Sequence, residues 1–89
     1  VMRNVSITLQ NVGEARPIIE AIQADNPGCE VVHMPALVKI DRAGEIVINT
    51  ESVSERVGRE WDPMELHMSL ISLSGNIDED DDRFVLSWQ

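Results

Sequence analysis

The chain has 89 residues, of which 43% are hydrophobic and 26% charged, a composition typical of one small globular domain spanning residues 1–89. Sixteen acidic against seven basic side chains give a formal charge of −9. This balance excludes nucleic acids and anionic membrane surfaces as partners, because both require clustered Lys and Arg, and it favours steering toward a basic patch on a protein. With Cys29 as its only cysteine and no apolar run of membrane-spanning length, the sequence predicts a cytoplasmic protein without an internal disulfide.

The chain opens with a predicted strand and a predicted helix. Strict alternation of apolar and polar residues over 5–9 indicates a strand with one buried face. A stripe with helical spacing follows, comprising Ala15, Ile18, Ile19 and Ile22. Because Pro17 is tolerated only in the first helical turn, the helix should begin near Gly13 or Glu14. The Asp-Asn-Pro-Gly segment at 25–28 predicts its end.

Three further strands are predicted in the middle of the chain. The runs 30–34 and 37–40 are separate strands, because Pro35 between them cannot donate a hydrogen bond in a central ladder. Residues 41–44 have the polar and Gly character of a hairpin turn. Residues 45–49 should therefore return as a strand.

Two short helices are predicted next. Residues 50–57 can form a helix that is capped by Thr50 or Ser52 and closed by Gly58. In residues 62–65, Asp stands at the cap, Pro at the first helical position and Glu at the third, an arrangement typical of a capping box. A second helix should begin there.

The chain ends in strand-like patterns. Residues 68–75 become strand-like, residues 76–82 read as a polar turn, and 84–88 predict a final strand with Phe84, Leu86 and Trp88 on one face. Strand, helix and strands thus occur once before Gly44 and again after it. We predict the α+β class: two β-α-β-β-like halves with a mainly antiparallel sheet and two or three short helices.

No catalytic, cofactor-binding or metal site is predicted. Glu30 and His33 have the Glu-x-x-His spacing of di-iron carboxylate sites, but that spacing brings side chains to one face only on a helix. In a strand the two residues point to opposite faces. A catalytic triad would need His33 or His67 to be placed against a carboxylate and a serine, and the sequence indicates no such set.

The acidic run 78–82 begins like a calcium-binding loop, and together with Glu65 and His67 it could hold a cation in principle. It does not continue as such a loop, because Arg83 stands where Gly is needed and Gln89 where a bidentate Glu is needed. We interpret the run as the solvated tip of a hairpin, which also repels neighbouring chains from the sheet edge.

Several segments together resemble the effector, or regulatory, component of bacterial multicomponent phenol hydroxylases, in the family that also serves methane and toluene monooxygenases. The segments are 14–22, 24–27, 34–41 and 71–75, the last leading into 78–82. None of them is a chemical motif, so the specificity of the resemblance lies in their order and spacing over nearly the whole chain.

The resemblance implies a protein that is not itself an enzyme and carries no metal or organic cofactor. Its partner would be the oligomeric di-iron hydroxylase, where it would stimulate NADH-dependent hydroxylation of phenol to catechol. It would do so by altering the access of substrate and oxygen to the di-iron centre. It would also couple hydroxylation to the electron supply from a reductase that carries flavin and an iron–sulfur cluster.

The resemblance also implies where the partner binds. The first candidate contact surface is a strand-like stretch that affects substrate access in relatives, here Ser69, Ile71, Ser72 and Leu73. The second is the helix that bears Glu14, Arg16, Glu20 and Gln23. Alternatively, Ile71 and Leu73 belong to the core and the serines simply face water, because period-two alternation predicts one buried face in any strand.

Two functions of other classes stay open. One is a stand-alone cofactor-free monooxygenase that uses a His and a Trp in a cleft between sheet and helix, which turnover by this protein alone would indicate. The other is a small-ligand-sensing α+β module, which would bind an amino acid or an aromatic acid without any protein partner. Fold alone does not separate these functions.

Overall fold

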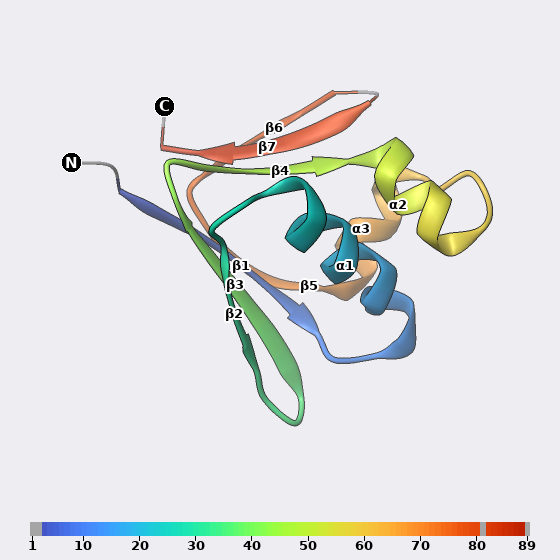
Figure 1. The fold of residues 1–89 in the computed structure, drawn as a ribbon, viewed down its shortest axis with the longest axis horizontal. Coiled ribbons are helices and arrows are strands. Elements are labelled where there is room, and N and C mark those ends of the chain that lie inside the picture. The colour runs from blue at the N-terminus through green and yellow to red at the C-terminus, as the bar shows by residue number, and fades with distance from the viewer. Residues whose placement is uncertain (1–2, 81, 89) are drawn as a thin grey trace.

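The computed structural model describes residues 3–80 and 82–88 (Figure 1). The first half of the chain forms β1 (Asn4–Gln10), the 3₁₀ turn η1 (Gly13–Ala15), α1 (Arg16–Asp25), β2 (Glu30–His33) and β3 (Leu37–Ala43). The second half forms β4 (Glu45–Asn49), α2 (Thr50–Val57), the 3₁₀ turn η2 (Pro63–Glu65), α3 (Leu66–Ser69), β5 (Leu70–Ser74), β6 (Asn76–Glu79) and β7 (Arg83–Ser87). The predicted α+β class is confirmed.

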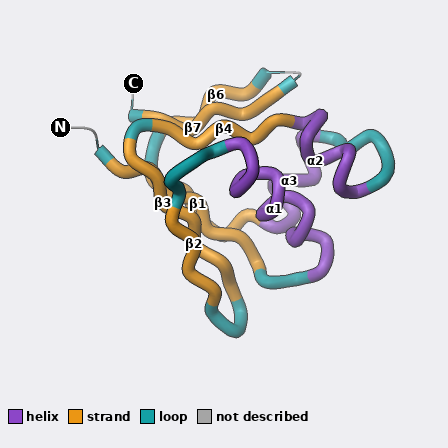
Figure 2. Tube along the Cα trace, viewed as in Figure 1, coloured by secondary structure: helices purple, strands orange, loops and turns teal. Residues whose placement is uncertain are grey.

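The described strands form two antiparallel sheets. The first sheet has the order β2-β3-β1-β5 and the second sheet the order β4-β7-β6, so β5 from the second half of the chain completes the sheet of the first half. In Figure 1, α1 lies in the angle between the two sheets. Figure 2 shows the helices gathered toward one side of the molecule, away from both termini.

The chain passes between the sheets at two glycines. Gly44, with φ 92°, lies between β3 and β4, and Gly75, with φ 137°, lies between β5 and β6. A Cβ atom on Gly75 would stand 3.1 Å from Leu86 Cδ1 and 3.2 Å from Val5 Cγ1, closer than ordinary packing allows. Both crossings therefore use a backbone conformation that side chains disfavour.

The prediction of a hairpin at 41–44 is wrong. β3 continues to Ala43, and β4 pairs with β7 in the second sheet. The reason is that β3 already has β1 on one edge and β2 on the other, so neither edge is free for β4. Arg42 fixes this corner, since its guanidinium donates to Glu45 O at 2.8 Å and to Pro27 O at 3.1 Å.

The predicted apolar stripe of α1 is confirmed as part of the core. Its four residues are at most 6% exposed, and Pro17 stands in the first turn as expected. The stripe packs in one cluster with the buried faces of both sheets, which include Ile7 and Ile40 from the first sheet and Ile46 and Leu86 from the second. The two halves of the chain thus share a core.

Asn26, at the end of α1, joins the helix to the second sheet. It is 1% exposed, and its side-chain amide donates to Ile22 O and Val47 O and accepts from Val47 N, each at 2.8 Å. These bonds satisfy the N–H and C=O of Val47, which point away from the neighbouring strand β7. The sequence indicated Asn26 only as part of a helix stop.

Three predicted details of the second half need correction. The cap of α2 is Asn49, whose side chain accepts from Glu51 N, and not Thr50 or Ser52; the helix ends at Gly58 as predicted. Residues 76–79 form β6 instead of a polar turn, because Ile77 packs against the core opposite Leu86. The hairpin tip contracts to the residues after Glu79, where Asp80 N donates to Arg83 O.

The final strand ends one residue earlier than predicted. Phe84 and Leu86 are buried, whereas Trp88 follows β7 and is 40% exposed. Its indole Nε1 donates to Asn4 O at 2.8 Å, and the Arg3 guanidinium lies 4.3 Å above its ring. Trp88 therefore links the end of the second sheet to the start of the first.

Candidate partner-binding surface

β5 carries most of the first candidate surface and lies at the edge of the first sheet, paired only with β1. Leu73 lies opposite Ile7 and Leu70 opposite Leu9, but the register shifts between them. This bulge breaks the alternation, so that Leu70 and Leu73 both pack against the core while Ile71 is 48% exposed. Ser72 is exposed as well. Of the two apolar residues predicted on one face, only Leu73 contacts the core.

Ser69 does not lie in the strand. It is the last residue of α3, because the helical segment that begins after Asp62 continues to Ser69 before the backbone becomes extended at Leu70. Its side chain is nearly covered, with 4% exposure. Ser69 is therefore not part of the exposed surface that Ile71 and Ser72 present.

A cavity of about 400 Å³ opens where η1, α1, α2 and α3 meet. Its apolar lining comes from Pro17, Ile18, Val57, Trp61 and Met68, and its polar lining from Glu14, Arg56, Arg59, Glu65 and Ser69. Glu14 belongs to the second candidate surface and Ser69 to the first. The fold therefore brings one residue of each predicted surface to the same cavity.

A set of polar contacts fixes the backbone beside this cavity. Asp62 Oδ1 accepts from Met64 N, and Glu65 Oε2 accepts from Asp62 N, which completes the predicted capping box. Glu65 also receives two hydrogen bonds from the Arg59 guanidinium, at 2.5 and 2.9 Å. These bonds, the Arg59 pair first and the Asp62 amide second, lower the pKa of Glu65 to about 2. Glu65 is therefore ionised at neutral pH and engaged on both oxygens.

Sequence analysis missed two exposed methionines on this segment. Met64 is 67% exposed and Met68 77%, the highest values among the large hydrophobic side chains of the described residues. The signal was present, since the two stand four residues apart in a segment with a helix start, and such residues share a helix face. Spacing alone does not separate an exposed pair from a buried one, because core-facing residues of a helix repeat at the same interval.

The rest of the second candidate surface lies elsewhere. Arg16, Glu20 and Gln23 line a groove of about 290 Å³ between α1 and the first sheet, together with His33 of β2 and Val38 of β3. Glu14 does not line this groove. The four residues of the second candidate surface are thus divided between two hollows.

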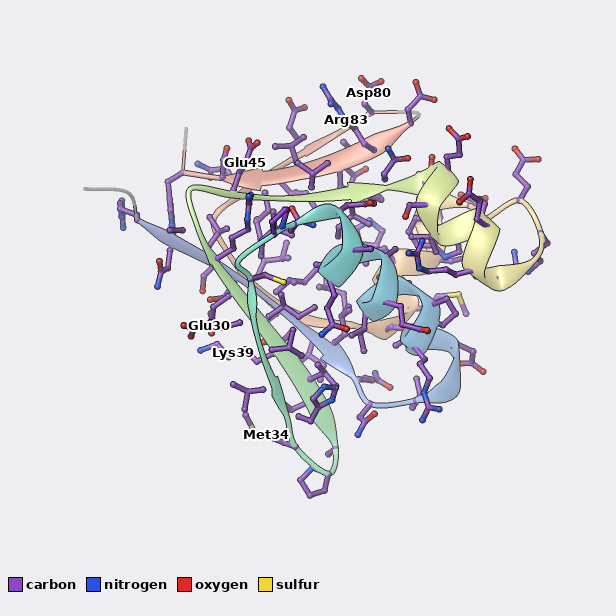
Figure 3. The ribbon with its side chains drawn as sticks, in the orientation of Figure 1. Glu30, Met34, Lys39, Glu45, Asp80 and Arg83 are labelled. Carbon is purple, nitrogen blue, oxygen red and sulfur yellow. The ribbon has the colours of Figure 1, made fainter. Side chains whose placement is uncertain are left out.

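The acidic run lies on the β6–β7 hairpin. Asp78, Glu79, Asp80 and Asp82 are exposed, and Asp81 of the predicted run lies outside the described residues. Figure 3 shows Asp80 and Arg83 pointing outward near the hairpin tip. His67 of α3 contacts this hairpin, with its Nε2 3.2 Å from Glu79 Oε1 and its ring edge-on to Phe84. This contact places the acidic hairpin beside α3.

The residues considered for metal chemistry are dispersed. In residues 3–80 and 82–88 no three His, Cys, Asp or Glu side chains are grouped so that they could hold a metal ion. Glu30 and His33 lie in strand β2, as predicted, opposite Asp41 and Val38 of β3. None of the helices in the described part of the chain has the length and apolar character needed to span a bilayer.

Comparisons with known proteins place the chain among monooxygenase effectors. A model of the MmoB/DmpM family matches residues 3–87. The chain is 45% identical over 85 residues to the phenol 2-monooxygenase stimulatory component DmpM of Pseudomonas sp. (strain CF600), covering 96% of this chain and 94% of that protein.

Solved structures give the same relationship. A chain in the structure of a phenol hydroxylase–regulatory protein complex is 41% identical, with a TM-score of 0.93 and coverage of 98% of this chain and 100% of that chain. The soluble methane monooxygenase regulatory protein B has a TM-score of 0.76 at 21% identity, over 97% of this chain and 65% of that one. The latter likeness shows a shared fold alone.

Proposed function

The chain belongs to the MmoB/DmpM family, and we propose that it is the stimulatory component of a phenol hydroxylase, acting on the hydroxylase without catalysing a reaction itself. The observation that carries this proposal is the 45% identity to a phenol 2-monooxygenase stimulatory component over almost the full length of both chains. The proposal treats residues 1–89 as a single effector domain. A core shared by both halves of the chain supports that reading.

The proposal requires that the effector bind one state of the hydroxylase more tightly than another. A ligand with equal affinity for two states shifts neither, so stimulation must come from contacts that differ between them. We propose that these contacts alter the access of substrate and oxygen to a di-iron centre in the hydroxylase. The same contacts would couple hydroxylation to electrons from an NADH-dependent reductase carrying flavin and an iron–sulfur cluster.

No cofactor is assigned to this chain in the proposal. The chemistry belongs to the di-iron hydroxylase and its reductase, and this protein contributes binding energy alone. The proposal also places the protein in the cytoplasm, where a lone cysteine such as Cys29 stays reduced.

For the contact surface, we propose that Ile71 and Ser72 meet the hydroxylase directly. Both are exposed on the edge strand β5, and the bulge turns Ile71 out of the core. Ser69 and Leu73 would support that surface from beneath, because Ser69 is buried and Leu73 packs against the core. Glu14 of η1 and, on α1, Arg16, Glu20 and Gln23 would form a second contact region.

Steady-state phenol hydroxylation tests the function. Purified hydroxylase and reductase are supplied with NADH and phenol, and this protein is titrated in and also assayed alone. Catechol formation that rises only when all components are present is the expected result. Turnover by the protein alone would identify an enzyme instead, and the absence of any effect on cognate partners would favour a small-ligand-sensing module.

A further inference from the structure

Three exposed apolar side chains follow one another at the end of the helical segment. Met64 on η2, Met68 on α3 and Ile71 on β5 are 67, 77 and 48% exposed, and we call them the apolar ridge. The other exposed large hydrophobic residues of the described chain are Val12, Val32, Met34 and Trp88, from separate elements or loops, each at most 46% exposed. Exposed apolar side chains that are concentrated in one short segment favour an interaction site there over scattered single exposures.

The backbone that carries the ridge is held rigidly. The capping box of Asp62 and Glu65 fixes η2, and the two hydrogen bonds from Arg59 fix Glu65. Leu66, which lies between the two methionines in sequence, is completely buried and anchors the segment in the core. The ridge therefore needs little ordering when it binds, which lowers the entropic cost of association. Methionine side chains also adapt to the shape of an apolar partner surface.

Acidic side chains border the ridge. Glu60 and Asp62 are exposed just before η2, and the contact between His67 and Glu79 holds the acidic β6–β7 hairpin beside α3. Two arginines line the cavity beside the ridge. Arg59 is paired with Glu65, whereas Arg56 bonds to Ser52 and has no carboxylate within ion-pair distance among the described residues. A complementary surface would be an apolar depression with a basic border.

We infer that the apolar ridge of Met64, Met68 and Ile71 is the central contact with the hydroxylase, seated in an apolar depression bordered by Arg or Lys. This inference rests on the proposed function and names the face through which it acts. A second copy of the chain fits the ridge less well, because each copy carries a formal charge of −9 and would bring a like-charged acidic border to the contact.

The test measures binding to the purified hydroxylase separately from turnover. The double variant M64S/M68S is compared with wild type and with the control Met34→Ser, whose side chain is 40% exposed at the turn between β2 and β3 and points outward in Figure 3. We expect Kd to rise at least about tenfold for the double variant and to stay within about twofold for the control, since a few central apolar residues dominate most interfaces. The variant M64L/M68L keeps the apolar volume and should bind nearly as wild type does.

The outcomes separate this inference from the proposed function. Wild type that neither binds nor stimulates the hydroxylase would overturn both. If wild type binds and M64S/M68S binds equally well, the ridge alone is overturned. The same holds if Met34→Ser weakens binding as much as M64S/M68S does. Loss of binding by M64L/M68L as well as by M64S/M68S would point to a disturbed fold and contradict the ridge as the contact.

Two further readouts test the border and the occupant. The association rate should fall as ionic strength rises, because the basic border steers an acidic effector, and a rate insensitive to salt would contradict that border. Size-exclusion chromatography of wild type and M64S/M68S tests the second copy. If wild type forms a dimer, and M64S/M68S is monomeric but still binds the hydroxylase, the ridge serves self-association and the inference is overturned.

Discussion

In two regions of the molecule similar polar contacts fix the backbone, but the neighbouring apolar side chains are buried in one region and exposed in the other. At the junction of α1 with the second sheet, Asn26 makes three side-chain hydrogen bonds while 1% exposed, and the helix residues before it belong to the core. In the η2–α3 segment, Asp62, Glu65 and Arg59 make a comparable set of bonds at the surface. There Met64 and Met68 face solvent.

The difference lies in what each set of bonds contributes. A buried polar group that loses its partner costs its full desolvation energy, so the junction contacts are expected to determine stability. Exposed partners can bond to water instead, so the surface contacts contribute little to stability and chiefly hold the ridge in place for binding. Substitutions in the two regions should therefore affect different measurements.

The largest effect on stability is expected from Asn26→Ala. The substitution removes all three side-chain bonds, one of them buried, and leaves the part-buried N–H and C=O of Val47 without their partner. The unfolding free energy should therefore fall by about 3 kcal/mol. Urea denaturation measures this loss. Asn11→Ala is the control, because Asn11 is exposed and donates a single side-chain bond, to Met34 O at 3.1 Å, and its loss should be about 0.5 kcal/mol or less. Equal losses in the two variants would contradict a junction held by burial.

The opposite behaviour is expected at β5. Ser72→Arg places a bulky cation on the exposed strand next to the ridge, where the hydroxylase is proposed to be basic, so the concentration needed for half-maximal stimulation should rise about tenfold. The thermal midpoint should remain close to that of wild type. Ser74→Arg is the matched control, because Ser74 is exposed on the same strand but lies next to Gly75, farther along from Met68. Unfolding of the Ser72 variant would show that Ser72 is structural.

Features that depend on local periodicity could be predicted from the sequence. The α1 stripe, the strands on either side of Pro35 and the capping box at Asp62 each follow from contacts within a few residues, and all are present in the structure. The hairpin predicted at 41–44 was wrong because it depends on contacts between residues that are distant in sequence. Whether β4 returns beside β3 depends on both edges of β3 being occupied, and that pairing is set by residues distant in sequence.

The candidate surface was predictable to the same extent. The resemblance indicated this segment, and the exposure of Ile71 agrees with a contact role that stays a prediction. Period-two alternation put Ile71 and Leu73 on one face, and only the register shift against β1 separates them. Nor could alternation locate Ser69, because the helix that begins at the capping box runs on to that residue before the strand starts.

A smaller effect is expected from the surface contacts of η2, and it should depend on pH. The pKa of Glu65 is lowered from 4.5 to about 2, so the folded state releases this proton at a lower pH than the unfolded state does. The resulting stabilisation is present above about pH 4.5 and is lost as the pH falls toward 2. The difference in unfolding free energy between wild type and Glu65→Gln should therefore be largest near pH 7 and shrink toward pH 2. Other carboxylates titrate in both proteins and cancel, so a difference that is constant with pH would contradict the assignment.

The smallest effect is expected where the ends of the two sheets meet, at the contact between Arg3 and Trp88. The guanidinium lies 4.3 Å above a ring that is 40% exposed, so Arg3→Ala should lower unfolding free energy by about 0.5 kcal/mol, the value for a solvated cation–π pair. Urea denaturation again measures the loss, and Trp88 fluorescence should change while that of Trp61, which is 4% exposed, should not. Arg3→Lys should retain part of the interaction. Asn26 joins α1 to the second sheet and is buried, whereas Trp88 links the ends of the two sheets at the surface. A loss for Arg3→Ala as large as that for Asn26→Ala would therefore show that burial does not determine the stability of such contacts.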